Sequence, residues 1–455
     1  MGVDEAGCGP AGAGRLKPKL RWFLLGLGFA GAAACLLMDG SWDSNRRMAA
    51  ALLVVAATLW FTEVVPPFAT GLLVILLGSI FLARPLGDPE LFLRPVASPV
   101  IALFFGGLVL ALALAKRGLD RRMAAVVLGR WGKNSNGLLW AVLGLTGVTS
   151  MFLSNTATTA LLITMLAPWV EAPGHDPNQK RRLGLAVAMA ASIGGIATVI
   201  GTPANAVAAG YLAANHHAIS FVGWMFWGLP LVVLLLGLTG WMVSRRIPVL
   251  PESGPSLAAP REPLDRGDWQ VIGTGVVTVA LWMTDWWHGL PAAYVALIPV
   301  SLFFLSGILT AADLRKLDWD VLLLIAGGFA LGSALEKSGL AGDVAQVLSR
   351  GEQAWQVALC LGGLAMVLSV FMSNTAAASL LVPIAGSVGV MDTTHAVLLT
   401  AFCCSLGMSL PVSTPPNALM HSRGWVQTRD LMIYGTLISL IALGVMVAVA
   451  AVLGR

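Results

Sequence analysis

The chain alternates long apolar runs with short polar segments, and the apolar runs are long enough to cross a bilayer as helices. A helical crossing needs about 20 mostly apolar residues. The pattern predicts spans near 22–38, 48–64, 68–84, 97–115, 182–216, 222–244, 269–287, 291–310, 320–336, 395–420 and 430–453. These about 11 transmembrane helices are typical of an all-α polytopic membrane protein.

Two more apolar regions, 136–170 and 353–390, carry a polar triplet near the middle. Polar groups at membrane depth are costly unless they are paired or bind something. Irregular backbone at that depth is tolerated only where it faces protein or a cavity. We therefore predict two re-entrant helical hairpins with a triplet at each tip. The triplets are Ser154-Asn155-Thr156 and Ser373-Asn374-Thr375.

Composition agrees with a membrane protein and excludes other classes. The 455 residues are 57% hydrophobic and only 11% charged, which no soluble domain of this size matches. Continuous apolar runs differ from the short alternating segments of a transmembrane β-barrel. A net charge of +5 without a clustered basic face argues against a nucleic-acid partner. The five cysteines show no metal-ligand spacing.

The distribution of lysine and arginine predicts the orientation. With the N-terminus inside, 21 of the 28 basic residues fall in the proposed cytoplasmic segments, in line with the positive-inside rule. We therefore expect a multi-pass protein of the cell's inner (plasma) membrane, with a cytoplasmic N-terminus and the C-terminus outside.

The two halves of the chain repeat the same elements in the same order, with opposite predicted directions through the membrane. Such inverted-topology repeats build many secondary transporters. We assign 1–20 to a cytoplasmic tail, 21–246 to the first repeat, 247–267 to a cytoplasmic linker and 268–455 to the second repeat. The matched elements are Leu59–Glu63 with Leu281–Asp285, Gly106–Leu119 with Gly327–Leu340, the two triplets, and Gly201–Asn205 with Ser413–Asn417.

The last matched pair places proline in the middle of spans 182–216 and 395–420. Proline lacks a backbone donor and disfavours helix in the residue before it. Both spans are therefore predicted to be broken helices, which expose carbonyls to cations and helix N-termini to anions.

The predicted tips and breaks contain no Lys, Arg or His. Hydroxyls and amides can donate to carboxylates, and hydroxyl and carbonyl oxygens suit small hard cations. A single triplet would more often be interhelical hydrogen-bonding glue, and a single proline a kink. Matched pairs of both favour one two-part site in which an anion and co-bound cations stabilise each other. Glu63 and Asp285 lie near span ends, where a structural role outweighs a coupling role.

These motifs are similar to those of the divalent anion/sodium symporter family, from about residue 20 to the end of the chain. The resemblance implies a homodimer in which a fixed scaffold holds an elevator-type transport domain. It also implies two sodium sites and one dianion site. The substrate residues would be Ser154, Asn155, Thr156, Thr202, Pro203, Ser373, Asn374, Thr375, Thr414 and Pro415. Sodium would be held by Ser150, Ser154, Asn155 and Gly201 at one site, and by Ser369, Ser373, Asn374 and Ser413 at the other.

The expected function is secondary active transport of a small dianion, namely a C4-dicarboxylate such as succinate, coupled to sodium. Sodium-coupled transport of sulfate or another oxyanion, and sodium-independent dicarboxylate exchange, are the alternatives within transport. A membrane enzyme is disfavoured because the chain has no His-Glu-x-x-His motif and no acidic pair at span centres. A passive channel is disfavoured by the inverted repeat with closed hairpins.

Overall fold

The computed structural model describes residues 18–38, 42–249, 263–349 and 353–453, and within them the fold is all-helical, as predicted. Most of the predicted tail and of the predicted linker lies outside the described residues. The first half contains α1 (Pro18–Leu37), α2 (Ser44–Thr62), α3 (Pro67–Phe81), η1 (Arg94–Ala97), α4 (Pro99–Lys116), α5 (Leu119–Trp131), α6 (Ser135–Ser150), α7 (Asn155–Val170), α8 (Pro177–Gly194), η2 (Gly195–Ala197), α9 (Pro203–Ala214) and α10 (Phe221–Arg246).

The second half follows the same order. It contains α11 (Arg266–Met283), α12 (Asp285–His288), α13 (Ala292–Leu305), α14 (Ala311–Leu314), α15 (Trp319–Lys337), α16 (Leu340–Leu348), α17 (Ala354–Phe371), α18 (Asn374–Gly386), α19 (Thr393–Ser405), α20 (Pro415–Ser422), α21 (Thr428–Asp430), the π-helical turn η3 (Leu431–Gly435) and α22 (Thr436–Leu453). Six described segments are long and apolar enough to cross a membrane, namely α1, α4, α10, α15, α17 and Thr428–Val452.

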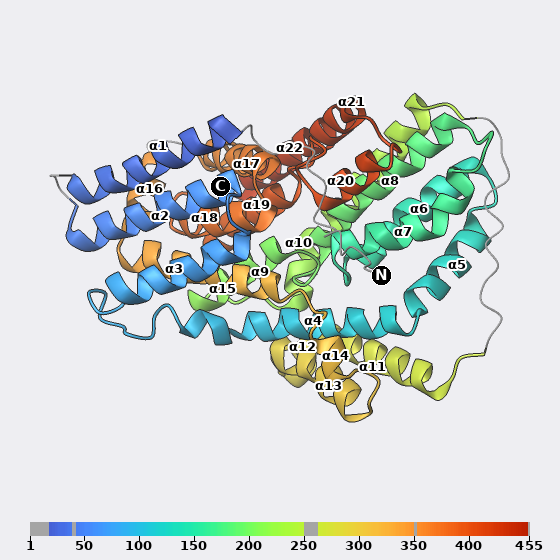
Figure 1. The fold of residues 1–455 in the computed structure, drawn as a ribbon, viewed down its shortest axis with the longest axis horizontal. Coiled ribbons are helices and arrows are strands. Elements are labelled where there is room, and N and C mark those ends of the chain that lie inside the picture. The colour runs from blue at the N-terminus through green and yellow to red at the C-terminus, as the bar shows by residue number, and fades with distance from the viewer. Residues whose placement is uncertain (1–17, 39–41, 250–262, 350–352, 454–455) are drawn as a thin grey trace, which may run out of the picture.

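The helices pack in two groups. In the first, α3 packs against α15, α4 against α13, and α1 and α11 lie at its edges. In the second, α6 packs against α8, α17 against α19, α10 against α8 and α22 against α17. Figure 1 shows α1–α3 at one end of the molecule, α5–α8 at the other and α4 running between them. Helix α15 joins the groups through α18 and α9.

Glycines allow the first group to pack closely at two matched places. An added Cβ on Gly327 of α15 would collide with Gly71 of α3, and one on Gly106 of α4 would collide with Ala296 of α13. Small residues let helix backbones approach in a membrane, where apolar burial alone does not drive association. The same contact therefore occurs twice, each time between one repeat and the other.

The polar segments after α4 and α15 contain the short helices α5 and α16, which the hydrophobic pattern treated as connecting segments. Gly118 and Gly339 precede them with φ values of 64° and 78°. Glycine adopts this left-handed conformation without the steric cost that a Cβ brings. The matched Gly-Leu dipeptides of the two halves therefore mark a sharp turn between two helices.

The matched tryptophans have a structural role. Trp60 and Trp282 are fully buried, and each indole N–H donates to a backbone carbonyl at the start of the following apolar helix. The acceptors are Pro67 and Ala292, both at 3.0 Å. The Trp-containing elements thus fix the turns α2–α3 and α11–α13.

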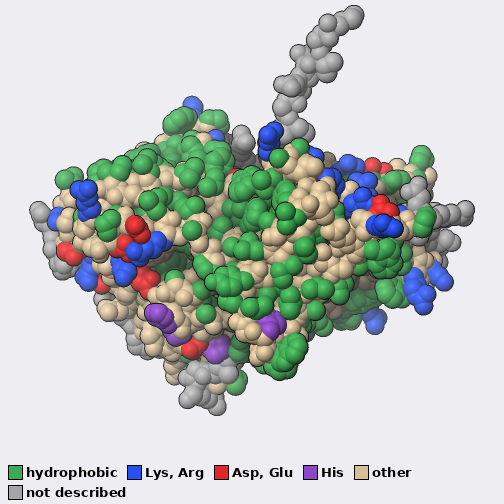
Figure 2. Space-filling view, turned by 90° about the horizontal axis from the view of Figure 1, so that it is seen from below, with side chains coloured by type: hydrophobic (Ala, Val, Ile, Leu, Met, Phe, Trp, Pro, Cys, Tyr) green, Lys and Arg blue, Asp and Glu red, His purple; other side chains and the backbone are tan. Residues whose placement is uncertain are grey.

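Ion pairs gather at the ends of the molecule. Figure 2 shows hydrophobic side chains over the middle of one face, with charged side chains toward its ends. Each long-range pair joins segments at or next to the same predicted side of the membrane, which is the arrangement that a consistent topology requires. Among the described residues, the pairs are Lys116–Asp313, Arg117–Asp265, Arg117–Asp268, Arg181–Asp430 and Arg423–Glu171 on the predicted cytoplasmic side, and Arg46–Asp343 on the other.

Candidate functional site

Both triplets lie where one helix ends and the next begins. Helix α6 ends at Ser150 and α7 begins at Asn155, while α17 ends at Phe371 and α18 begins at Asn374. The triplet serines cap the second helix of each pair, because Ser154 Oγ accepts from Ala157 N and Ser373 Oγ from Ala376 N, both at 3.2 Å. Capping satisfies amide groups that would otherwise lack partners at a helix start.

Both Thr-Pro elements lie where a helix restarts after a break. Helix α8 and the turn η2 end at Ala197 before α9, and α19 ends at Ser405 before α20. Thr202 and Thr414 cap the new helices, and the prolines that follow them, Pro203 and Pro415, stand at the first helical position. Proline is suited to that position because its missing N–H would be unpaired there anyway.

An asparagine side chain donates hydrogen bonds to backbone carbonyls in each helix break. Asn205 Nδ2 donates to the carbonyls of Gly195 (2.9 Å) and Thr198 (2.8 Å). Asn417 Nδ2 makes the matching bonds to Met408 (2.9 Å) and Leu410 (3.0 Å). Each asparagine satisfies carbonyls that the interrupted helix leaves without intrahelical partners, so the break is a stable feature of the fold.

Three oxygens converge beside the first hairpin tip, and we call them the first oxygen triad. Ser150 Oγ lies 2.7 Å from both Asn155 Oδ1 and the Ala191 carbonyl oxygen. Ser150 is fully buried. A hydroxyl has a single proton and can donate to only one acceptor at a time, so the cluster is rich in lone pairs. Its chemistry fits a small hard cation, which prefers oxygen ligands.

The second oxygen triad repeats this arrangement at the other tip. Ser369 Oγ lies 2.6 Å from Asn374 Oδ1 and also contacts the Cys404 carbonyl. Ser369 too is fully buried. Two of the predicted sodium ligands of each site, the serine and the asparagine, are therefore in contact, and each triad adds a helix carbonyl that sequence reasoning did not name.

Of the other predicted sodium ligands, Ser154 and Ser373 are the helix caps described above, while Gly201 and Ser413 occupy matched places but differ in their contacts. Ser413 Oγ lies 3.3 Å from the Val370 carbonyl oxygen near the second tip. Gly201 has no side chain, and Thr198 instead donates to the equivalent Met151 carbonyl, at 2.5 Å. Sequence reasoning missed Thr198, because it stands at a different place in its break than Ser413.

Glycines bring the broken helices against the tips. A Cβ added to Gly195 would lie 2.7 Å from Asn155 Oδ1 and 2.6 Å from Thr202 Cγ2. A Cβ added to Gly407 would lie 2.7 Å from Ser369 Cβ. Real Cβ atoms do not approach so closely, so neither position has room for a side chain. The absence of a side chain at Gly195 thus lets a predicted cation residue, Asn155, and a predicted substrate residue, Thr202, lie close to the same backbone position.

The two tips differ in exposure. Thr375 is buried, whereas Thr156 is exposed. Helix α18 is covered by α15, and α7 has no comparable packing against α4 among the described helices. The exposed face of α7 carries Thr156, Ala160, Thr164 and Pro168. Small and polar residues on an exposed helix face are atypical of a lipid contact, where large apolar side chains dominate.

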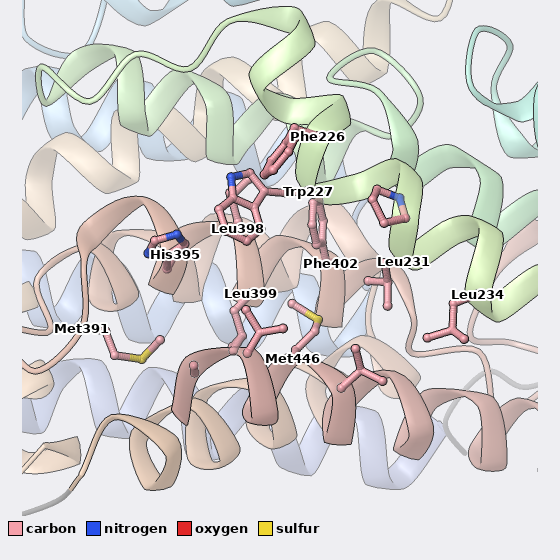
Figure 3. A pocket seen from close by; sticks show the side chains of 14 residues that line it. Phe226, Trp227, Leu231, Leu234, Met391, His395, Leu398, Leu399, Phe402 and Met446 are labelled. Carbon is pink, nitrogen blue, oxygen red and sulfur yellow. The ribbon is translucent and has the colours of Figure 1, made fainter. Parts of the chain in front are cut away.

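An open cavity of about 500 Å³ continues this face to its charged end, where Glu171 and Arg423 line it. A second cavity, of about 370 Å³, lies between α10, α19 and α22 (Figure 3). Apart from His395, its lining is apolar, with Phe226, Trp227 and Met446 among its side chains, so it offers little to an anion. The described residues contain no cluster of His, Cys, Asp and Glu that could hold a metal ion.

Comparisons with known proteins find similar transporters. Residues 57–394 match the family model described as "Citrate transporter". The chain is 30% identical to the sodium-dependent dicarboxylate transporter SdcS of Staphylococcus aureus strains bovine RF122 and NCTC 8325, over 89% of this chain and 85% of the relative.

Two solved structures share the fold at low sequence identity. The Alcanivorax borkumensis YdaH transporter has a TM-score of 0.58 at 14% identity, covering 85% of this chain and 97% of its own. Neisseria gonorrhoeae MtrF has a TM-score of 0.57 at 13% identity, covering 95% of this chain and 94% of its own. With the family model matched over most of the chain and the SdcS relatives matched nearly end to end, the chain belongs to the divalent anion/sodium symporter family.

Proposed function

We propose that this membrane transporter moves a C4-dicarboxylate such as succinate across the membrane together with sodium. The observation that carries the proposal is the pair of oxygen triads, one at the start of α7 and one at the start of α18. The sodium-dependent dicarboxylate relatives support the same substrate class and the same coupling ion.

The residues divide between two tasks. The two triads, with Gly201 and Ser413, would hold sodium through neutral oxygens. Ser154, Thr156, Thr202 and their second-repeat counterparts would donate to the dianion. Sodium supplies the positive charge that the site's own side chains lack, so that each ligand lowers the cost of burying the other. Coupling then follows from electrostatics and does not need a titrating side chain.

The exposure of α7 supports a route to the site from the predicted cytoplasmic side. The two helix groups resemble a scaffold and a transport domain, with α15 against α18 and α9 as the sliding contact. Covered Thr375 and exposed Thr156 fit one end state of an elevator-type movement. We propose a homodimer in the inner membrane with the N-terminus inside, in which the scaffold group forms the subunit contact.

Uptake into proteoliposomes tests the proposal. Radiolabelled succinate should accumulate under an inward sodium gradient and not under a matched potassium gradient. Sodium-driven uptake of sulfate without uptake of succinate would reject the dicarboxylate as substrate in favour of an oxyanion. Exchange of succinate without a sodium requirement would reject sodium coupling in favour of an exchange mechanism.

Substitutions test the site. Asn155→Ala and Asn374→Ala each remove one oxygen of a triad, and we expect sodium-driven uptake to fall at least about tenfold, since a lost charge-assisted contact costs roughly 1.5–3 kcal/mol. Asn178→Ala, at an exposed position on α8, is the matched control and should transport normally. Near-normal uptake by both triad variants would refute the assignment.

A further inference from the structure

Ser192 and Ser405 form a matched pair that neither the triplets nor the proline breaks include. Each directly follows the residue whose carbonyl belongs to an oxygen triad, Ala191 in the first half and Cys404 in the second. Each is followed two residues later by a glycine that packs on the first helix of its hairpin. Both serines are fully buried. They therefore occupy equivalent positions in the two repeats.

Their contacts are not equivalent. Ser405 Oγ lies 3.3 Å from Thr202 Oγ1, which joins the end of α19 to the start of α9. Thr202 Oγ1 also accepts from Asn205 N at 3.3 Å and so caps α9. Ser192 Oγ has no hydrogen-bond partner among the described residues. A side-chain hydrogen bond between the two broken helices is thus formed by Ser405, and its counterpart Ser192 does not form one.

We propose that the Ser405–Thr202 hydrogen bond makes the two cation sites interdependent, an inference that rests on the proposed sodium coupling. The Cys404 carbonyl and the Ser405 amide share one planar peptide unit. A displacement of Ser405 therefore moves the carbonyl oxygen that completes the second triad.

The other end of the bond reaches the first site. Thr202 adjoins Gly201, and both Thr202 Cγ2 and Asn155 Oδ1 lie in the space that a Cβ on Gly195 would need. A cation that orders the first triad and the break beside it also orders Thr202, and through Ser405 it positions the Cys404 carbonyl. Linkage makes this effect reciprocal, so a cation at the second site strengthens binding at the first by the same factor.

A sodium titration of the purified full-length protein tests the inference without requiring transport. Sodium that binds the folded state raises the melting temperature, and choline chloride controls for ionic strength. We expect a sigmoidal response with a Hill coefficient above one for the unmodified protein. For Ser405→Ala we expect a Hill coefficient near one and a half-saturating sodium concentration raised about five- to tenfold, the low end of typical coupling factors.

Two further variants separate coupling from a packing effect. Ser405→Thr keeps the hydroxyl and should restore the sigmoidal response, whereas Ser192→Ala removes an equally buried hydroxyl without a bond and should behave like the unmodified protein. If Ser405→Ala does not fold, Ser405→Cys, with a similar volume and a weak donor, takes its place and should show the same loss of cooperativity.

The outcomes distinguish this inference from the proposed function. A cooperative unmodified protein with unchanged Ser405→Ala behaviour, or equal losses in Ser405→Ala and Ser192→Ala, would overturn the inference alone. An unmodified protein that shows no sodium response in the titration and no sodium-driven uptake would overturn both.

Discussion

Single residues determine how close the hairpin tips come to the broken helices. Ser150 and Ser369 each bring a hydroxyl, an amide oxygen and a helix carbonyl together. Gly195 and Gly407 leave the space in which this contact occurs. The serines and asparagines could be found in the sequence because the triplets repeat. The partner carbonyls could not, since any backbone carbonyl would serve.

A methyl group at Gly195 should disable the first site. Gly195→Ala places a Cβ within van der Waals overlap of Asn155 Oδ1 and Thr202 Cγ2, and overpacking of this kind costs about 1–3 kcal/mol. We expect sodium-driven uptake to fall and the half-saturating sodium concentration to rise. Gly144→Ala in α6, where nothing lies within 4 Å of an added Cβ, should leave uptake unchanged. Equal behaviour of the two variants would contradict the role given to Gly195.

At the scale of elements, charged side chains attach the short connecting helices to the long ones. Asp313 of α14 accepts from Lys116 Nζ at 2.6 Å, from Thr310 Oγ1 at 2.8 Å and from Thr310 N at 2.9 Å. Hydrogen bonds from the Lys116 ammonium and from Thr310 hold the pKa of the Asp313 carboxyl well below its usual range. This contact ties the end of α4 to the connection between α13 and α15.

The lowered pKa predicts a pH-dependent contribution to stability. Because the folded-state pKa lies below the unfolded value of about 3.9, the contribution is present above that value and is lost as the pH falls toward the folded-state pKa. Asp313→Asn should lower the melting temperature at pH 7 by a few degrees, and the difference should shrink below about pH 4. Asp320→Asn, at an exposed position at the start of α15, is the control and should have little effect. A difference that does not change with pH would contradict the ion-pair explanation.

At the scale of the whole molecule, the two repeats are alike in order but unlike in exposure. Helix α18 is buried against α15, whereas the matching face of α7 is open from Thr156 to the cavity beside Glu171. Two equivalent halves therefore form a structure that is open on one side. An inverted repeat is compatible with such an asymmetric structure. If α7 became covered and α18 became exposed, the molecule would be open on the opposite side.

Cysteine labelling tests the open side. With the accessible native cysteines replaced, Thr164→Cys on α7 should react with a membrane-impermeant maleimide added to inside-out vesicles. Val233→Cys, on an exposed apolar face of α10, should face lipid and stay unreactive. Labelling of Thr164→Cys only from the outer side would reverse the predicted orientation, and equal labelling of both positions would place the α7 face in lipid.

The sequence by itself determined the helical class, the positions of both tips and breaks, and the order of the repeat. Its information on these points is local: apolar length, the cost of polar groups in lipid and the backbone limits of proline act within a few residues. The apolar pattern does not predict α5 and α16, because these short helices form no continuous apolar run.

Tertiary structure alone decided which backbone carbonyls complete the two oxygen triads. It also decided that Thr202 contacts Ser405, whereas no such bond joins the matching residues Thr414 and Ser192 among the described residues. Finally, it decided that α18 is covered while one face of α7 is open. These contacts join residues far apart in the chain. They depend on how the two similar halves pack against each other. Because the motifs are nearly the same in both halves, they do not indicate which half becomes covered.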